Sequence, residues 1–460
     1  MQRPLYWHQG LFLQPQHFQQ FDLYIQSLFE PLRFLSSPYA WGLKSIKIAD
    51  VSLKNSIIEL VEGEFVLKDG TWISVPENAT VRPRALRDDD LESGKPVRVY
   101  IGIRDWNRTG RNVTVVKQPA EVSSAGTRFV TFDESEEVRD MHQGGDTAPV
   151  KTMSYALRII WEDELDECAE YQVLPVAEIE NADGVLKVST VYIPPILSIG
   201  SSSILRQIIH GIRDRIASRC RKLEEYKSPK GIQSAQVEMS YIVFMLALRS
   251  LNRYVPLLYH LTETDAVHPW NVYGLLRNII GELSTYTDRI DSLGRLMDGT
   301  SLLPPYDHED IHHCFNEASL LIGELLETIV IGPESIIHMK RENGLFKAKV
   351  SSEILSVNNS FFLVLQTAES RDRVLETIRS IAKFSSINYM KILIERALPG
   401  LPLKHNLNPP PGLPKRPNSY YFEIDQSHAQ WIEIRKNQSV CFYWDQAPND
   451  TIAELVVMRK

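Results

Sequence analysis

The sequence predicts a multidomain α+β protein with three consecutive parts. Residues 1–195 contain short runs of β-branched and aromatic residues between turn signals, a pattern typical of a β-sandwich or an open barrel. Residues 196–331 repeat apolar residues at steps of three and four, which predicts a four-helix bundle. Residues 332–460 mix strand-like and helix-like runs, which predicts an α+β domain of ordinary size.

The opening segment places large apolar side chains among amides and imidazoles. Trp7, Leu11, Phe12 and Phe18 belong to it, and its apolar run stops at Gln14. A secretory leader needs an unbroken apolar stretch of roughly 7–15 residues after a positive start. We therefore expect mature protein here, an extended arm that turns into a helix at the following proline. The apolar groups of the arm can pack on their own β domain or contact a partner, and self-packing is the favoured interpretation.

Strand-like runs recur from Trp41 to Pro195, and Glu-Gly and Asp-Gly pairs between them suit hairpin turns. The expected strands are Ser45–Ile48, Ile57–Val61, Phe65–Leu67, Trp72–Val75, Val97–Ile103, Arg128–Phe132, Tyr155–Ile160 and Val185–Ile193. Residues 133–149 are polar and acidic with a Gly-Gly pair, which predicts a mobile loop.

Helical spacing begins after the Pro-Pro pair at 194–195. Ser201–Ser203 can cap the first helix, the third is expected to begin at Pro269, and the fourth is expected over Asp307–Ile331. The seam residues expected to pack this region and to join copies of the chain are Ile209, Ile212, Ile216, Leu223, Tyr241, Phe244, Leu248, Ile311, Phe315, Ile322 and Leu325. A compact monomeric bundle is the alternative, because the spacing alone does not separate the two.

The last part is expected to alternate strands with one helix. The expected strands are Ile336–Lys340, Leu345–Val350, Phe361–Gln366, Lys391–Glu395, Tyr420–Ile424, Val440–Trp444 and Ile452–Met458. A helix is expected near Arg371–Lys383. The proline-dense stretch Leu398–Pro417 predicts a polyproline-II-like segment or a surface loop.

Composition narrows the classes of function. The net charge of −8, from 50 basic and 58 acidic residues, argues against a general nucleic-acid binder. The longest apolar run, Tyr241–Leu248, is far shorter than the ~20 residues of a membrane span, so we expect no direct membrane insertion. The four cysteines lie far apart without a C-x-x-C pair, which fits a reducing cytoplasm. No phosphate-binding loop or dinucleotide fingerprint occurs, and we expect no cofactor.

One motif resembles a catalytic signature. His308, Glu309 and His312 match H-E-x-x-H, in which two histidines one helical turn apart bind zinc and the glutamate activates water. Asp307 precedes them where a helix N-cap belongs, which places His308 in the first helical turn. Positions 315 and 318 lack the glycine and histidine of the extended motif, so no third ligand follows. We expect a solvated or capping cluster, with a zinc metallopeptidase as the lesser alternative.

Five segments, in order, resemble the motifs of the TssK family, also called ImpJ or VasE, whose members are baseplate subunits of the bacterial type VI secretion system. The opening reads W-x-Q-G-x-x-L-x-P-Q-H-F. The other segments are Tyr192–Pro195; His268-Pro269 with Leu275 and Gly281–Leu283; Pro305–His308; and Leu398–Leu403 with Pro410–Pro414, Tyr421–Glu423 and Trp431. The resemblance therefore extends from Trp7 to Trp431.

The resemblance implies a non-enzymatic adaptor with three parts. These are a shoulder like that of phage receptor-binding proteins, a helical neck that holds a homotrimer, and a head. The shoulder would contact the baseplate subunits TssF and TssG, with TssE nearby, and the head would engage the cytoplasmic parts of TssL and TssM. Such a protein is cytoplasmic and reaches the inner membrane through its partners. A surface adhesin that binds a receptor or a carbohydrate is the other alternative function.

Overall fold

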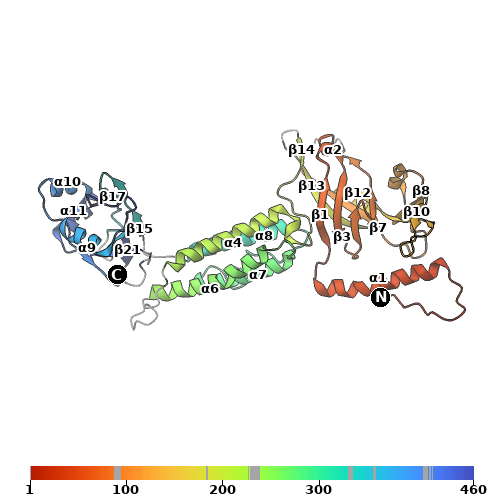
Figure 1. Cartoon of the computed structure of the whole chain (residues 1–460), viewed down its shortest axis with the longest axis horizontal. Helices are drawn as coiled ribbons and strands as arrows, with labels where there is room; N and C mark the ends of the chain where they lie inside the picture. The colour runs from red at the N-terminus through yellow and green to blue at the C-terminus, as the bar shows by residue number, and fades with distance from the viewer. Residues whose placement is uncertain are drawn as a thin grey trace. The chain divides into compact units, whose positions relative to one another are not determined.

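The computed structural model describes residues 2–87, 95–182, 185–225, 227, 239–329, 335–355, 359–407, 413, 416 and 418–459. The chain divides into two compact units, and Figure 1 traces its course from the N-terminus to the C-terminus. The first contains residues 1–214 and 257–325, and the second contains residues 215–256 and 326–460. The division falls within three long helices, so the three-part organisation expected from the sequence stays a prediction.

The first unit begins with a long helix, α1 (Pro15–Ser36), drawn in Figure 1 as a rod separate from the sheets. A three-stranded antiparallel sheet follows, in the order β1 (Gly42–Ile48), β3 (Leu60–Val66) and β4 (Trp72–Val75). The arm thus becomes a helix at Pro15, as expected. Pro15 suits the first helical position, because its missing N–H would be unpaired there in any case.

A larger mixed sheet forms most of the β structure of this unit. Its order is β14 (Val185–Val188), β13 (Tyr171–Ala182), β7 (Val97–Arg104), β12 (Ser154–Trp161), β9 (Phe129–Phe132) and β8 (Val113–Val116), with β5 (Ala79–Val81) beside β12. Strands β2 (Ile57–Ile58) and β6 (Arg84–Ala85) form a separate pair. Short helices are α2 (Asp50–Lys54), η1 (Pro119–Ser124) and η2 (Glu162–Cys168). Runs of β-branched and aromatic residues between turn signals found β1, β4, β7, β9, β12 and the start of β14, but they missed β5, β6, β8 and the long β13.

The region expected to be a loop is instead a hairpin. Strand β10 (Glu136–Arg139) pairs with β11 (Thr147–Val150) across a turn in which Gly144 N donates to Asp140 O at 3.0 Å. Both strands are exposed along their whole length. The prediction was wrong because a strand without a buried face has no alternating pattern to reveal it.

The helices of the central region are α4 (Ser203–Glu224), α6 (Met239–Thr262), α7 (Pro269–Leu283) and α8 (Ile311–Thr328), with the short η3 (Ile199–Ser201) and η4 (Ser284–Tyr286). Ser202 accepts a hydrogen bond from Leu205 N at 3.3 Å, so a serine caps α4 as expected. The fourth helix begins at Ile311 rather than at Asp307, because Asp310 accepts from His313 N at 3.3 Å and takes the capping role.

Among its described residues after α8, the second unit contains two sheets and three helices. The five-stranded antiparallel sheet has the order β15 (Ser335–His338), β23 (Ile452–Arg459), β18 (Asn359–Gln366), β21 (Ser419–Ile424) and β20 (Leu403–His405). The four-stranded sheet has the order β16 (Lys340–Glu342), β17 (Leu345–Lys349), β22 (Ser439–Tyr443) and β19 (Lys383–Ser385). The helices are α9 (Arg371–Ser380), α10 (Ile387–Glu395) and α11 (Ala429–Asn437).

The main core of this unit is rich in aromatic residues. Phe361, Phe422 and Trp431 belong to it, and the Phe361 and Trp431 rings lie 4.6 Å apart between centroids. The strand expected at Lys391–Glu395 is wrong, because these residues form the last turns of α10. Ser386 caps the start of this helix by accepting a hydrogen bond from Tyr389 N at 3.3 Å. No helix within the described residues is long and apolar enough to cross a membrane.

Candidate functional site

His308 of the H-E-x-x-H motif is a buried structural residue. Its side chain is 2% exposed, with Nε2 2.9 Å from Trp41 O and Nδ1 2.8 Å from the Tyr306 hydroxyl. Because a carbonyl oxygen only accepts, we assign the ring hydrogen to Nε2, and Nδ1 then accepts from Tyr306. Both ring nitrogens are therefore occupied, and neither is left to bind a metal.

The other residues of the motif point to different roles. The Glu309 carboxylate pairs with Lys68 Nζ at 2.6 Å, and the Lys68 ammonium lies 4.7 Å from the centre of the Trp41 ring. No group of three or more histidine, cysteine or acidic side chains that could hold a metal ion occurs in the part of the chain that the structure describes. The expected placement of His308 in the first turn of the helix and in a solvated cluster is wrong, since it precedes α8 and is buried.

A second histidine completes the site. His268 caps α7, because its Nδ1 accepts from Trp270 N at 3.1 Å, and its Nε2 donates to Tyr39 O at 2.9 Å. The His268 and His308 rings stack with centroids 5.4 Å apart and planes 17° apart. Burial lowers the pKa of both imidazoles, and that of His308 falls to about 4. Both rings are therefore neutral at physiological pH.

The chain between α1 and β1 is held by contacts with three distant segments. Its Tyr39 and Trp41 carbonyls accept from the two histidines, and Leu43 N donates to Pro195 O at 2.8 Å. A Cβ at Gly42, where φ is +128°, would lie 2.8 Å from the Pro195 carbonyl, so only glycine fits. We call this set of contacts the histidine junction. It joins β1 to the entries of α4, α7 and α8, and it offers a mechanical connection rather than a reactive group.

The seam residues expected in the neck are buried within one chain. Those whose side chains are described are at most 6% exposed: Ile209, Ile212, Ile216, Leu223, Phe244, Leu248, Ile311, Phe315, Ile322 and Leu325. The side chain of Tyr241 lies outside the described residues. These groups pack the helices of their own chain, so contact between copies needs other residues.

Helix α6 carries apolar side chains that are exposed in the part of the chain that the structure describes. Ile242, Val243 and Leu246 are 40–48% exposed, although Phe244 and Leu248 of the same run are buried. The signal was present in the sequence, since an apolar run of this length covers every face of a helix rather than one stripe. We call Ile242, Val243 and Leu246 the α6 surface.

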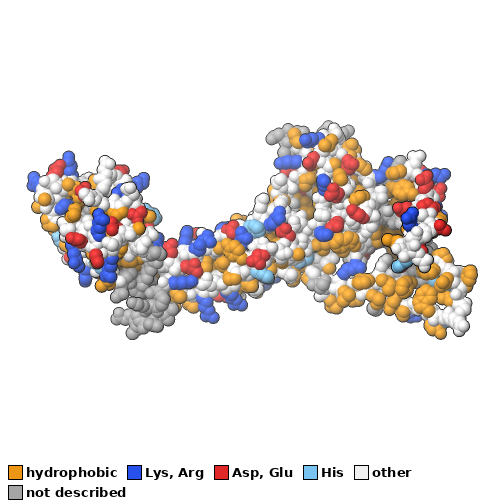
Figure 2. Space-filling model, viewed as in Figure 1, with side chains coloured by type: hydrophobic (Ala, Val, Ile, Leu, Met, Phe, Trp, Pro, Cys, Tyr) orange, Lys and Arg blue, Asp and Glu red, His pale blue; other side chains and the backbone are white. Residues whose placement is uncertain are grey.

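The N-terminal arm is exposed, which contradicts the favoured expectation of self-packing. Trp7 is 50% exposed, Phe12 80% and Phe18 54%, while Leu11 is partly covered. Contacts of the arm are with α1: Gln2 N donates to Ser27 Oγ at 3.0 Å, and the Trp7 ring lies 6.3 Å from that of Phe21. Figure 2 shows hydrophobic side chains gathered along the arm and α1 at the lower right.

Helix α1 continues this exposed surface with a regular seam. The seam consists of Phe18, Phe21, Ile25, Leu28, Leu32 and Leu35, at alternating steps of three and four. All except the partly covered Leu28 are 37–79% exposed. This spacing is that of a helix that packs against another helix or a groove. The spacing is already present in the sequence, because it needs no tertiary contact to be recognised. We call these six residues the α1 seam.

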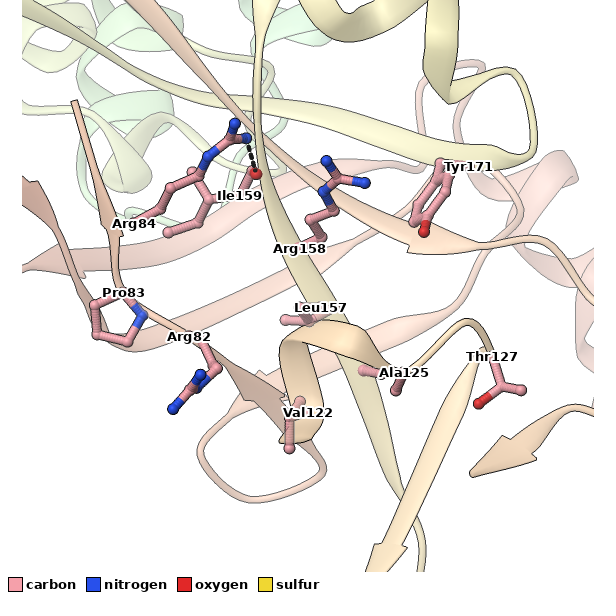
Figure 3. A pocket seen from close by; sticks show the side chains of 11 residues that line it. Arg82, Pro83, Arg84, Val122, Ala125, Thr127, Leu157, Arg158, Ile159 and Tyr171 are labelled. Carbon is pink, nitrogen blue, oxygen red and sulfur yellow. Dashed lines mark hydrogen bonds between the residues drawn. The ribbon is translucent and has the colours of Figure 1, made fainter. Parts of the chain in front are cut away.

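A shallow cleft of about 290 Å³ lies among β6, η1, β12 and β13 (Figure 3). Three of its lining residues are arginines: Arg82, Arg84 and Arg158. Arg84 donates to Ile159 O at 2.8 Å and pairs with Glu164, so its charge is neutralised. The side chain of Arg158 makes no hydrogen bond or ion pair with the described residues, and Arg82 and Arg158 are both exposed. The cleft has no carboxylate, histidine or cysteine among its lining residues, so nothing there would activate the hydroxyl of Thr127 or Tyr171.

Comparisons with known proteins agree on one family. The family model described as bacterial type VI secretion, VC_A0110, EvfL, ImpJ, VasE matches residues 17–458. The type VI secretion system baseplate component TssK1 of Pseudomonas aeruginosa is 27% identical over 441 residues, which cover 95% of this chain and 94% of that protein.

Two solved structures share the fold. A chain of the baseplate complex from the type VI secretion system matches with a TM-score of 0.63 and 20% identity, over 100% of this chain and 99% of that chain. A chain of the TssK-TssF-TssG baseplate subcomplex matches with a TM-score of 0.59 and 21% identity, over 71% and 99%. At these identities the likeness establishes a mixed α+β multidomain fold.

Proposed function

The chain belongs to the ImpJ and VasE family of bacterial type VI secretion proteins, and from that premise we propose that it is a non-enzymatic baseplate subunit. The observation that carries the proposal is the family match over nearly the whole chain, from residue 17 to residue 458. The relative of similar length is a baseplate component. The hydrogen bonds on both nitrogens of His308 argue against the zinc peptidase.

The β-rich part of the first unit is the shoulder in this proposal, and it binds TssF and TssG through the arm and the α1 seam. A related chain was solved in a complex with proteins of those names. Burying one large apolar side chain contributes about 1.5–3 kcal/mol, so six along one helix are enough for a stable contact. An amphipathic helix with anchors at this spacing is suited to a hydrophobic groove. TssE lies near this contact in the proposed assembly.

The four helices form the neck, and the α6 surface joins three copies of the chain. The buried seam residues hold each bundle together, while Ile242, Val243 and Leu246 remain available for a neighbouring copy. A trimer matters because three weak contacts on one stalk act at a high effective concentration.

The C-terminal α+β domain is the head, and it engages the cytoplasmic parts of TssL and TssM. Ile392 and Ile394 on α10 and Ile432 on α11 are exposed there and provide apolar contact area. The subunit is then cytoplasmic and peripheral to the inner membrane, to which it connects through these partners.

Copurification with TssF and TssG tests the shoulder contact. We expect Ile25→Glu and Leu32→Glu to abolish copurification, because each places a charge in the apolar seam. Gln26→Glu adds the same charge to an exposed position of the same helix and should leave binding intact. Circular dichroism must show equal folding for all three variants. Full binding by both seam variants would refute the assignment of α1.

A further inference from the structure

Strand β23 contains a buried acid. Glu454 is 2% exposed, and both its oxygens accept from Arg416 Nη1, at 2.8 and 2.9 Å. The same carboxylate lies 3.0 Å from His338 Nδ1 on β15. An unpaired buried carboxylate is costly, because it loses its hydration without compensation. Arg416 is therefore the partner that allows Glu454 to stay charged inside the C-terminal domain.

The same guanidinium contacts the end of α4. Arg416 Nε donates to Glu225 Oε2 at 2.9 Å, and Glu225 directly follows the last residue of that helix. The Glu225 side chain is 40% exposed and that of Arg416 is 24% exposed. One arginine thus links the buried acid of the sheet to a helix that precedes the domain by more than a hundred residues.

A second arginine acts at the same end of α4. Arg219 Nη2 donates to the carbonyl of Ile329, which follows the last residue of α8. The last C=O groups of a helix lack intrahelical partners, so this contact satisfies one of them. The final turns of α4 therefore hold both the exit of α8 and the C-terminal sheet.

We propose that Glu225, Arg416 and Glu454 form a latch with one permanent and one releasable half. The permanent half is Arg416–Glu454, where the carboxylate is buried and accepts twice. The releasable half is Arg416–Glu225, a single hydrogen bond to a side chain that water already reaches. An ion pair this exposed contributes little to the stability of the fold and is weakened by salt. A buried pair that loses one partner instead costs much stability, because an uncompensated charge stays buried.

The consequence is a defined point of separation. When the C-terminal domain is displaced from α4, the contact with Glu225 breaks first, and Arg416 stays with the domain and keeps Glu454 neutralised. The domain can then change its orientation without unfolding. This conformational device goes beyond the proposed function and does not depend on the identity of any partner.

Single-molecule energy transfer in the full chain tests the latch. The native cysteines are all buried, so Lys222→Cys on α4 and Lys404→Cys on β20 provide exposed sites for a dye pair. Coexpression with excess unlabelled chain ensures that each assembly carries one labelled copy. We expect one narrow distribution of transfer efficiency in the latched protein.

Glu225→Gln should release the domain. We expect the fraction of unlatched molecules to rise about fivefold, because a partly exposed ion pair shifts an equilibrium by about that factor. Molar salt should raise this fraction by the same amount in the original protein. The melting temperature should not change. Glu224→Gln is the matched control, because the Glu224 carboxylate is next to Glu225 in the chain but pairs with Lys227. This variant should give the same distribution as the original protein.

Glu454→Gln should instead lower the melting temperature, because it breaks the buried half. Arg416→Ala removes both halves, so it should lower the melting temperature and also release the domain. The latch is refuted if Glu225→Gln gives the same distribution as Glu224→Gln. It is also refuted if Glu225→Gln lowers the melting temperature as much as Glu454→Gln, since Glu225 would then belong to the core.

Discussion

Helices α1 and α8 carry apolar side chains at the same alternating steps, yet the two seams lie in opposite environments. Ile311, Phe315 and Ile322 of α8 are fully buried against their own chain. Phe18 and Leu32 of α1 are 54% and 63% exposed. The spacing predicts that one face of a helix will be buried, but it does not predict which part of this chain or of a partner will cover that face. The difference separates residues that stabilise the subunit from residues that are available to partners.

The largest effect should come from a charge in the buried seam. We expect Ile322→Asp to lower the free energy of unfolding by more than ~4 kcal/mol, because the carboxylate would be buried without a partner. Leu320→Asp, at a position that is 53% exposed on the same helix, should change it by less than ~0.5 kcal/mol. Urea denaturation followed by circular dichroism measures both. Equal stability of the two variants would show that the two faces of α8 are wrongly assigned.

The histidine junction should make the first unit sensitive to acid. The pKa of His308 falls from its ordinary 6.5 to about 4 because of burial, so the unfolded chain binds the proton more readily. The stabilisation is complete above pH 6.5 and is lost as the pH falls from there toward 4, a change on the order of 3 kcal/mol. His268 shifts in the same direction.

Comparing the original protein with His308→Gln isolates this contribution. Glutamine can donate to Trp41 O without titrating at these pH values, so its stability curve should be flatter between pH 4 and 6.5. Urea denaturation at several pH values gives both curves. If they remain parallel, His308 is not the group responsible.

The positions of many strands and of the central helices could be predicted from the sequence, because runs of β-branched and aromatic residues and helical spacing are local properties. The histidine junction could not, because it depends on contacts between residues more than two hundred positions apart, such as Tyr39 with His268. The H-E-x-x-H pattern was misleading for the same reason. Spacing places His308 near His312, but the Trp41 carbonyl and the Tyr306 hydroxyl decide what His308 does.

A smaller loss should follow from a charge on the α6 surface. We expect Leu246→Asp to dissociate the proposed trimer, whose mass is three times the 52.6 kDa of one chain, while each chain stays folded. Losing one apolar contact of this size costs about 1.5–3 kcal/mol per copy, and the added charge costs more. Native mass spectrometry reads the outcome. The control is Leu320→Asp on α8, where the leucine is 53% exposed against 48% for Leu246. A trimer that survives Leu246→Asp but not Leu320→Asp would move the interface to α8.

The smallest effect should be on the stability of the exposed seam itself. Leu32→Asp in the isolated subunit should change the free energy of unfolding by no more than ~0.5 kcal/mol, since the side chain already lies in water. Once the proposed partners TssF and TssG are bound, the same substitution should become costly, because the leucine would then be covered. Thermal unfolding with and without the partners measures the two values. A large loss in the isolated subunit would mean that α1 packs against its own chain in solution, and the contrast with α8 would disappear.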